Sequence, residues 1–92
     1  MKILVAEDDT SLRKALVSIL AKNQYSVDAV DNGGDALDYL RSGLYDAAVL
    51  DIMMPGMDGL EMCRKIRETN NIPIIMLSAR SADLDKILGL GT

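Results

Sequence analysis

Apolar residues form two kinds of short segment along the chain. Continuous apolar runs occupy residues 3–6, 47–50 and 72–77, whereas residues 25–30 alternate between apolar and polar side chains. Continuous runs of this length are typical of strands covered on both faces, and alternation indicates a strand nearer a sheet edge. These four segments are the predicted strands.

Segments with helical spacing separate the strands. The first has apolar residues at i, i+3, i+4, i+7 and i+8, which form one stripe along a helix: Leu12, Ala15, Leu16, Ile19 and Leu20. Asp9 or Thr10 is its predicted N-cap. Further helices are predicted over residues 35–42, ended by Gly43, and over residues 59–69.

The same spacing predicts the inward faces of the later helices. These faces are Ala36, Leu37 and Leu40 in the second helix, and Leu60, Cys63 and Ile66 in the third. A last short helix is predicted after Ser81. Because strands and helices alternate, we expect an α/β domain with a parallel sheet and helices on both faces.

Composition narrows the class of protein. The chain has 92 residues, 49% hydrophobic and 26% charged, which fits one globular domain over residues 1–92. The net charge of −4 argues against a nucleic-acid-binding surface on this segment, and the lack of histidine excludes histidine-based catalysis. Cys63 is expected to be a packed thiol. With no long apolar run and no signal-peptide pattern, a cytoplasmic location is expected.

Acidic residues follow the predicted strands. Asp51 ends the third strand, just before Pro-Gly and Asp-Gly turn signals, and taken alone it could simply cap a turn. Glu7-Asp8-Asp9 follow the first strand, Asp31 the second and Ser78 the fourth. In a doubly wound sheet the carboxyl ends of the strands lie along one edge, where ligands bind.

Neighbouring first and third strands would bring Asp8 and Asp51 together. Carboxylates brought so close raise each other's pKa unless a cation intervenes. Oxygen ligands without His or Cys favour Mg²⁺ or Mn²⁺ over Zn²⁺. The alternative is that residues 7–9 only cap the following helix, which is the expected role of Asp9. A carboxylate beside Mg²⁺ can accept a phosphoryl group, and Ser78 could hydrogen-bond that group, although serine is also common in turns.

Three motifs together resemble the receiver domain of bacterial two-component response regulators. They are Glu7-Asp8, the segment from Asp51 through Met53-Met54-Pro55-Gly56-Met57-Asp58-Gly59, and Pro73-Ile74-Ile75-Met76-Leu77-Ser78-Ala79. The resemblance spans essentially the whole chain and implies a flavodoxin-like doubly wound sheet with strand order 2-1-3-4. The residues of these motifs are most similar to those of receivers that precede a winged-helix DNA-binding domain.

The resemblance implies roles for individual residues. Asp51 would accept a phosphoryl group from a sensor histidine kinase. Asp8, Asp51 and the backbone carbonyl of Met53 would bind Mg²⁺, and Glu7 would reach the ion through water. Ser78 would be the switch hydroxyl, Ala79 would leave room for the phosphoryl group, and Pro55 and Gly56 would shape the loop.

The chain departs from the family beyond the fourth helix. Receivers continue into a fifth strand, which ends in a phosphoryl-contacting lysine, and a fifth helix; Lys86 lies in the predicted fourth helix and is not assigned that role. We therefore expect a receiver truncated before the fifth strand, with weak phosphorylation. Self-association is expected through Ile74–Leu77 or an uncovered sheet face, and a sharp monomer mass in light scattering would contradict it.

Competing functions are less well supported. A haloacid-dehalogenase-type phosphatase needs a second Asp two residues after the nucleophile, where this chain has Met53, so phosphoryl-Asp51 would be held and at most slowly lost. No G-x-G-x-x-G follows the first strand, which argues against dinucleotide binding. A phosphorylation-independent interaction module on a receiver fold is the main alternative. DNA contact is expected only through an output domain outside this chain.

Overall fold

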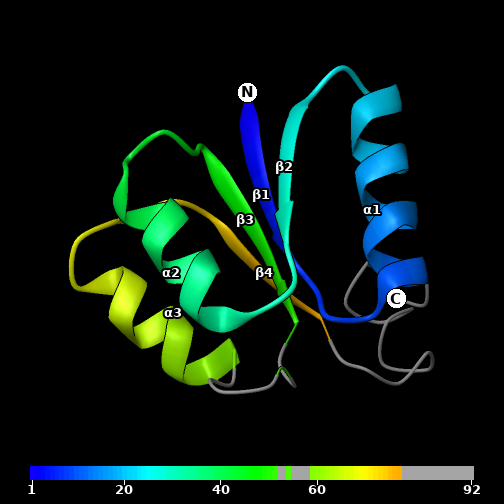
Figure 1. Ribbon diagram of the computed structural model, residues 1–92. Coiled ribbons are helices and arrows are strands. Elements are labelled where there is room, and N and C mark those ends of the chain that lie inside the picture. Colours follow the sequence, from blue (N-terminus) through cyan, green and yellow to red (C-terminus); the bar gives the residue numbers. More distant parts are fainter. Residues whose placement is uncertain (52–53, 55–58, 78–92) are drawn as a thin grey trace, which may run out of the picture.

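A four-stranded parallel sheet organises the structure (Figure 1), a computed structural model that describes residues 1–51, 54 and 59–77. The strands are β1 (Lys2–Ala6), β2 (Ser26–Val30), β3 (Ala47–Asp51) and β4 (Ile74–Leu77), in the order β2-β1-β3-β4. The described helices are α1 (Thr10–Lys22), α2 (Gly33–Arg41) and α3 (Gly59–Arg67). The predicted parallel α/β sheet, its strand order and the edge position of β2 are confirmed.

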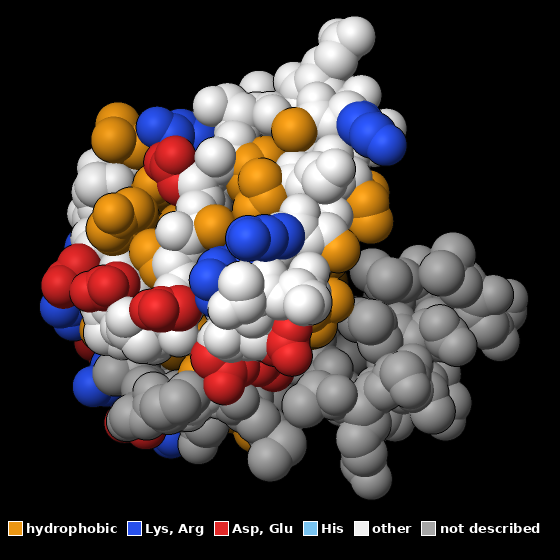
Figure 2. All heavy atoms as spheres, turned by 45° about the vertical axis from the view of Figure 1, so that its right-hand side comes forward, with side chains coloured by type: hydrophobic (Ala, Val, Ile, Leu, Met, Phe, Trp, Pro, Cys, Tyr) orange, Lys and Arg blue, Asp and Glu red, His pale blue; other side chains and the backbone are white. Residues whose placement is uncertain are grey.

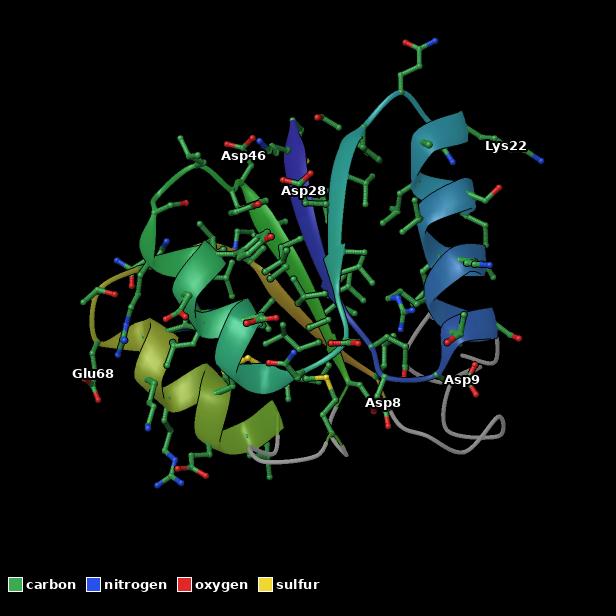
Figure 3. All side chains as sticks on the ribbon, viewed as in Figure 1. Asp8, Asp9, Lys22, Asp28, Asp46 and Glu68 are labelled. Atoms are coloured by element: carbon green, nitrogen blue, oxygen red, sulfur yellow. The ribbon has the colours of Figure 1, made fainter. Side chains whose placement is uncertain are left out.

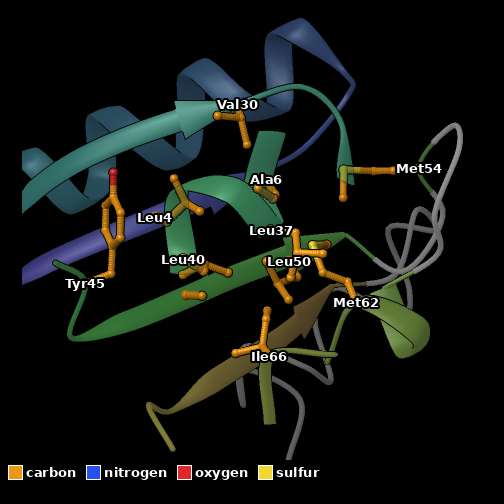
Figure 4. Close-up of a cluster of buried hydrophobic side chains, with 12 residues drawn as sticks. Leu4, Ala6, Val30, Leu37, Leu40, Tyr45, Leu50, Met54, Met62 and Ile66 are labelled. Carbon is orange, nitrogen blue, oxygen red and sulfur yellow. The ribbon is translucent and has the colours of Figure 1, made fainter. Parts of the chain in front are cut away.

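Helices cover both faces of the sheet. Helices α2 and α3 lie together on one face and α1 on the other (Figure 1). Successive side chains of the central strands β1 and β3 point to opposite faces of the sheet. Leu4 and Leu50 pack toward α2 and α3 (Figure 4), while Val5 and Val49 pack toward α1. This double burial explains why these strands are continuous apolar runs.

The cap of each early helix follows from its sequence. The Asp9 side chain accepts a hydrogen bond from the Leu12 amide at 2.8 Å, so Asp9 is the N-cap of α1. Asn32 caps α2 in the same way through the Asp35 amide, and α2 begins at Gly33, two residues before the predicted start. Gly43 follows α2 with a φ of 77°, a left-handed conformation that glycine adopts without steric cost.

Two predictions about helix faces are wrong in part. In α3 the buried residues are Met62 and Ile66, whereas Leu60 is 62% exposed. At roughly 100° per residue, Leu60 lies about 160° around the helix from Met62, so both cannot face the sheet. In α1, Leu12, Leu16 and Leu20 pack on the sheet, whereas Ala15 and Ile19 are exposed.

Apolar side chains reach the surface on the side of the molecule that carries α1 (Figure 2). Ile19 is 57% exposed and Ile75, on β4, is 46% exposed. Within the described sheet β4 is an edge strand, so the expected self-association through this strand stays a prediction. Among the described residues, the helices are too short or too polar to cross a membrane.

Candidate functional site

The candidate site lies at the carboxyl ends of β1 and β3. These strands are parallel neighbours, and their register pairs Ala6 with Leu50. Glu7, the residue after β1, is therefore level with Asp51, the last residue of β3. Asp8 and Asp9 follow in the connection to α1, at the same end of the sheet (Figure 3).

Three carboxylates meet at this position. One carboxylate oxygen from each of Glu7, Asp8 and Asp51 lies within 4.8 Å of the other two. Glu7 is 2% exposed and Asp51 1% exposed, whereas Asp8 is exposed to solvent. The predicted convergence of Asp8 and Asp51 is confirmed.

The three consecutive acids after β1 have different roles. Asp9 caps α1, as predicted. Glu7 accepts a hydrogen bond from the Asp9 amide through Oε2 at 2.9 Å, and its own amide donates to the Val30 carbonyl at 3.1 Å. The view that residues 7–9 only cap the helix is therefore wrong, because Glu7 and Asp8 belong to the carboxylate cluster.

Burial and crowding shift the proton affinities of the cluster. Burial is the main cause that raises the pKa of Glu7 to about 7; the carboxyls of Asp8 and Asp51 contribute in the same direction, and the hydrogen bond from the Asp9 amide acts against them. The pKa of Asp8 is lowered, chiefly by its hydrogen bond with Glu7. Glu7 therefore holds a proton more readily than Asp8 does.

The donor set fits a hard divalent cation. All three side chains offer oxygen, and the described part of the chain brings no thiolate into the cluster. Mg²⁺ takes oxygen ligands and is usually held by one or two carboxylates while it keeps several waters, which the exposed Asp8 side of the cluster allows. A bound dication would also relieve the repulsion that raises the pKa of Glu7.

Other predicted site residues lie elsewhere or outside the described residues. Asp31 follows β2 but is exposed, and its Oδ1 accepts a hydrogen bond from Asn32 at 2.8 Å, so it does not join the cluster. Met54 is buried in the core. Predicted site residues outside the described part of the chain are Met53, Pro55, Gly56, Ser78 and Ala79.

Sequence reasoning missed one residue beside the cluster. Arg13, in α1, donates hydrogen bonds to the backbone carbonyls of Glu7 and Asp8. A cation near the N-terminus of a helix opposes the helix dipole. An arginine at this position therefore indicates that its side chain makes a specific contact, and the sequence contained that signal.

Known proteins with similar sequences are response regulators. The response regulator MprA of Mycobacterium avium is 45% identical over 91 residues, which cover 98% of this chain and 40% of that protein. The transcriptional regulatory protein DltR of Streptococcus agalactiae is 44% identical, over 98% of this chain and 41% of that protein. The chain thus spans about two fifths of the length of these relatives.

Solved structures agree with the fold. The response regulator protein TrrA of Thermotoga maritima, crystallised in complex with Mg²⁺-BeF, matches with a TM-score of 0.81 and 40% identity, over 88% of this chain and 71% of that one. A crystal structure of histidine kinase ThkA in complex with TrrA matches with a TM-score of 0.80 and 41% identity, over 87% of this chain and 70% of that one.

The family comparison covers nearly the whole sequence. The response regulator receiver domain matches residues 3–91, a range that contains all three carboxylates of the cluster and the whole described sheet apart from Lys2. The chain belongs to the response regulator receiver domain family.

Proposed function

We propose that Asp51 is the phosphoacceptor of this receiver domain and that its phosphoryl donor is the phosphohistidine of a sensor histidine kinase. The observation that carries the proposal is the meeting of the Glu7, Asp8 and Asp51 carboxylates at the end of β1 and β3. An Asp51 oxygen attacks the phosphorus and forms an O–P bond. The P–N bond breaks, and its electron pair remains on the imidazole nitrogen. The ThkA–TrrA complex supports a histidine kinase as partner.

The cluster is proposed to hold Mg²⁺, or Mn²⁺ in its place. Asp8, Asp51 and the backbone carbonyl of Met53 would be direct ligands, and Glu7 would act through water. When bound, the ion offsets negative charge on the incoming phosphoryl oxygens. Glu7 and Asp8 set the negative charge that attracts the ion, and the burial of Asp51 limits the access of water to the acyl phosphate. The TrrA structure with Mg²⁺-BeF supports this choice of ion.

The remaining predicted residues complete the proposed site. Ser78 would hydrogen-bond a phosphoryl oxygen, Ala79 would leave space for that group, and Pro55 and Gly56 would shape the loop after Asp51. Receiver domains are generally classed as non-enzymatic phosphoacceptors. Met53 cannot activate water, so we expect phosphoryl-Asp51 to be lost slowly.

The consequence of phosphorylation is proposed to lie outside this chain. DltR is a transcriptional regulatory protein, and the chain matches about two fifths of it. By analogy, the receiver would switch a DNA-binding output domain, and DNA would be contacted only through that domain.

The test is incubation with a small phosphodonor and Mg²⁺, followed by intact-mass measurement. We expect partial addition of one phosphoryl group, lost when Mg²⁺ is chelated and absent in Asp51→Asn. The matched control is Asp38→Asn, the same chemical change at an exposed position of α2. No uptake by the parent chain, or uptake that survives Asp51→Asn, would overturn the proposal. A chain that folds and binds Mg²⁺ but takes up no phosphoryl group would support the interaction-module alternative.

A further inference from the structure

The Arg13 side chain connects helix α1 to the acidic loop that precedes it. Its Nη1 donates a hydrogen bond to the Glu7 carbonyl at 2.9 Å and a longer one to the Asp8 carbonyl at 3.4 Å. Its own backbone amide donates to the Asp9 carbonyl at 2.9 Å. One residue of α1 therefore binds the backbone of all three consecutive acids.

These contacts are directed at the backbone, although acidic side chains are nearby. Arg13 lines a groove of about 280 Å³ together with Asp31, Asp35 and Tyr39. A guanidinium in such surroundings could have paired with a carboxylate, which is its usual strong partner. The hydrogen bonds that the structure describes for this guanidinium go to carbonyl oxygens of the Glu7-Asp8 segment instead.

Asp8 is the cluster member that most needs such support. Glu7 and Asp51 are enclosed by the fold, and Glu7 is also held by the Asp9 amide. Asp8 is exposed, so packing does not fix its side chain. The direction of its Cα–Cβ bond depends on the two peptide planes that flank it, and each plane is rigid. Arg13 holds the carbonyl oxygen of each of these planes.

We propose that Arg13 is a positioning residue: by binding the Glu7 and Asp8 carbonyls, it keeps the Asp8 carboxylate directed toward the cation site. The inference rests on the proposed function, because it assumes that Asp8 binds Mg²⁺. Arg13 contacts neither the ion nor the phosphoryl group in this role.

The chemistry of the side chain explains why arginine stands here. A guanidinium presents several N–H donors in one rigid plane and can bind two neighbouring acceptors at once. A lysine ammonium has the same charge on a flexible stem and fixes two carbonyls less well. Charge and geometry can therefore be separated by substitution.

The test measures Mg²⁺ affinity by isothermal titration in Arg13→Ala, Arg13→Lys and the parent chain. Outer-shell residues of metal sites typically change affinity by about 10–100-fold, so we expect Arg13→Ala to weaken Mg²⁺ binding roughly tenfold. Arg13→Lys should weaken it less, in the same direction. The control is Lys14→Ala, which removes one charge from an exposed position of the same helix and should not weaken binding.

The sign of the effect separates this role from simple electrostatics. Loss of a cation beside a cation site should tighten Mg²⁺ binding if charge alone matters, and Arg13→Lys should then change nothing. A merely structural role would lower the thermal midpoint without changing the affinity of the folded protein. If Arg13→Ala does not fold, Arg13→Lys decides.

The outcomes also distinguish this inference from the proposed function. Parent-level or tighter Mg²⁺ binding in both Arg13 variants overturns the positioning role and leaves the phosphoacceptor assignment intact. A parent chain that does not bind Mg²⁺ overturns both. Weaker binding in both Arg13 variants, with Lys14→Ala unaffected, supports the positioning role.

Discussion

Acidic side chains lie at both ends of the sheet, but their surroundings differ (Figure 3). At the amino end, the Tyr45 hydroxyl donates to Asp28 at 2.6 Å, Lys2 lies 3.5 Å from the same carboxylate, and the Lys2 amide donates to Asp46. At the carboxyl end, Glu7, Asp8 and Asp51 face one another.

The proton affinities reflect this difference. The Tyr45 hydrogen bond holds the pKa of Asp28 below its usual range, and Lys2 adds to the effect. Burial and neighbouring acids raise the pKa of Glu7 to about 7. Acids that receive a hydrogen bond or pair with a cation of the protein stabilise the fold. Acids that are crowded together form a site where an external cation can bind. The comparison therefore separates structural from functional carboxylates within one sheet.

The largest expected effect is on metal binding. Asp8→Asn removes a proposed direct ligand and should weaken Mg²⁺ binding about 100-fold, or ~3 kcal/mol, at the upper end of the range for residues that support metal sites. Asp28→Asn, the same change at the other end, should leave the affinity within about twofold because the sites are independent. Calorimetric titration measures both. Equal losses of Mg²⁺ affinity in the two variants would contradict the view that only the carboxylates at the carboxyl end of the sheet bind the ion.

The second expected effect is a pH dependence of stability in the metal-free protein. The pKa of Glu7 rises from 4.5 to about 7 on folding, so between these pH values the folded state binds more protons than the unfolded state. The contribution of Glu7 to stability is then fully present below about pH 4.5 and is lost as pH rises through about 7. Glu7→Gln should abolish this slope, as measured by urea unfolding at several pH values with a chelator. A slope that persists in Glu7→Gln would place its origin elsewhere.

A smaller effect is expected at the amino end. Tyr45→Phe removes a buried hydroxyl that donates to a charged acceptor, and it should lower the free energy of unfolding by about 1.5–2 kcal/mol. Mg²⁺ affinity should not change, because the described contacts of Tyr45 are made at the amino end of the sheet. Urea unfolding and titration of the same sample check both parts. A loss of Mg²⁺ affinity in a folded Tyr45→Phe variant would show that the ends are coupled.

The smallest effect is expected for Lys2→Met. The Lys2 Nζ pairs with Asp28 and lies 5.4 Å from the Tyr45 ring centroid, but both partners of the ion pair are partly exposed. We expect a loss of about 0.5–1 kcal/mol that shrinks at high salt. Denaturation at low and high ionic strength measures it. A larger, salt-independent loss would indicate that packing of the lysine stem matters more than its charge.

Local patterns in the sequence predicted the strands and helices of a parallel sheet, and the resemblance to receiver domains supplied the strand order. Apolar runs located β1 and β3, and once these strands are neighbours the residues that follow them lie together, which brings Asp8 close to Asp51. The N-cap Asp9 and the glycine after α2 also follow from local chemistry.

Features that depend on tertiary packing could not be predicted. The stripe in α1 is apolar over a wide arc, and the sequence does not say that Leu16 rather than Ile19 faces the sheet. In α3 the choice of Leu60 over Met62 failed for the same reason. The Tyr45–Asp28 pair joins residues 17 positions apart and depends on strand register, and the burial that shifts Glu7 depends on the whole fold.

The connection between β1 and α1 consists of three residues, Glu7, Asp8 and Asp9, and each of them has a role. Glu7 and Asp8 belong to the carboxylate cluster, and Asp9 is the N-cap of α1. We therefore expect the length of this loop to be restricted, because one inserted residue would displace the carboxylates of the cluster from one another or the N-cap from α1. The connection after α2, where Ser42, Gly43 and Leu44 are exposed, has no such constraint. Insertions and deletions among relatives should collect there and avoid the acidic loop.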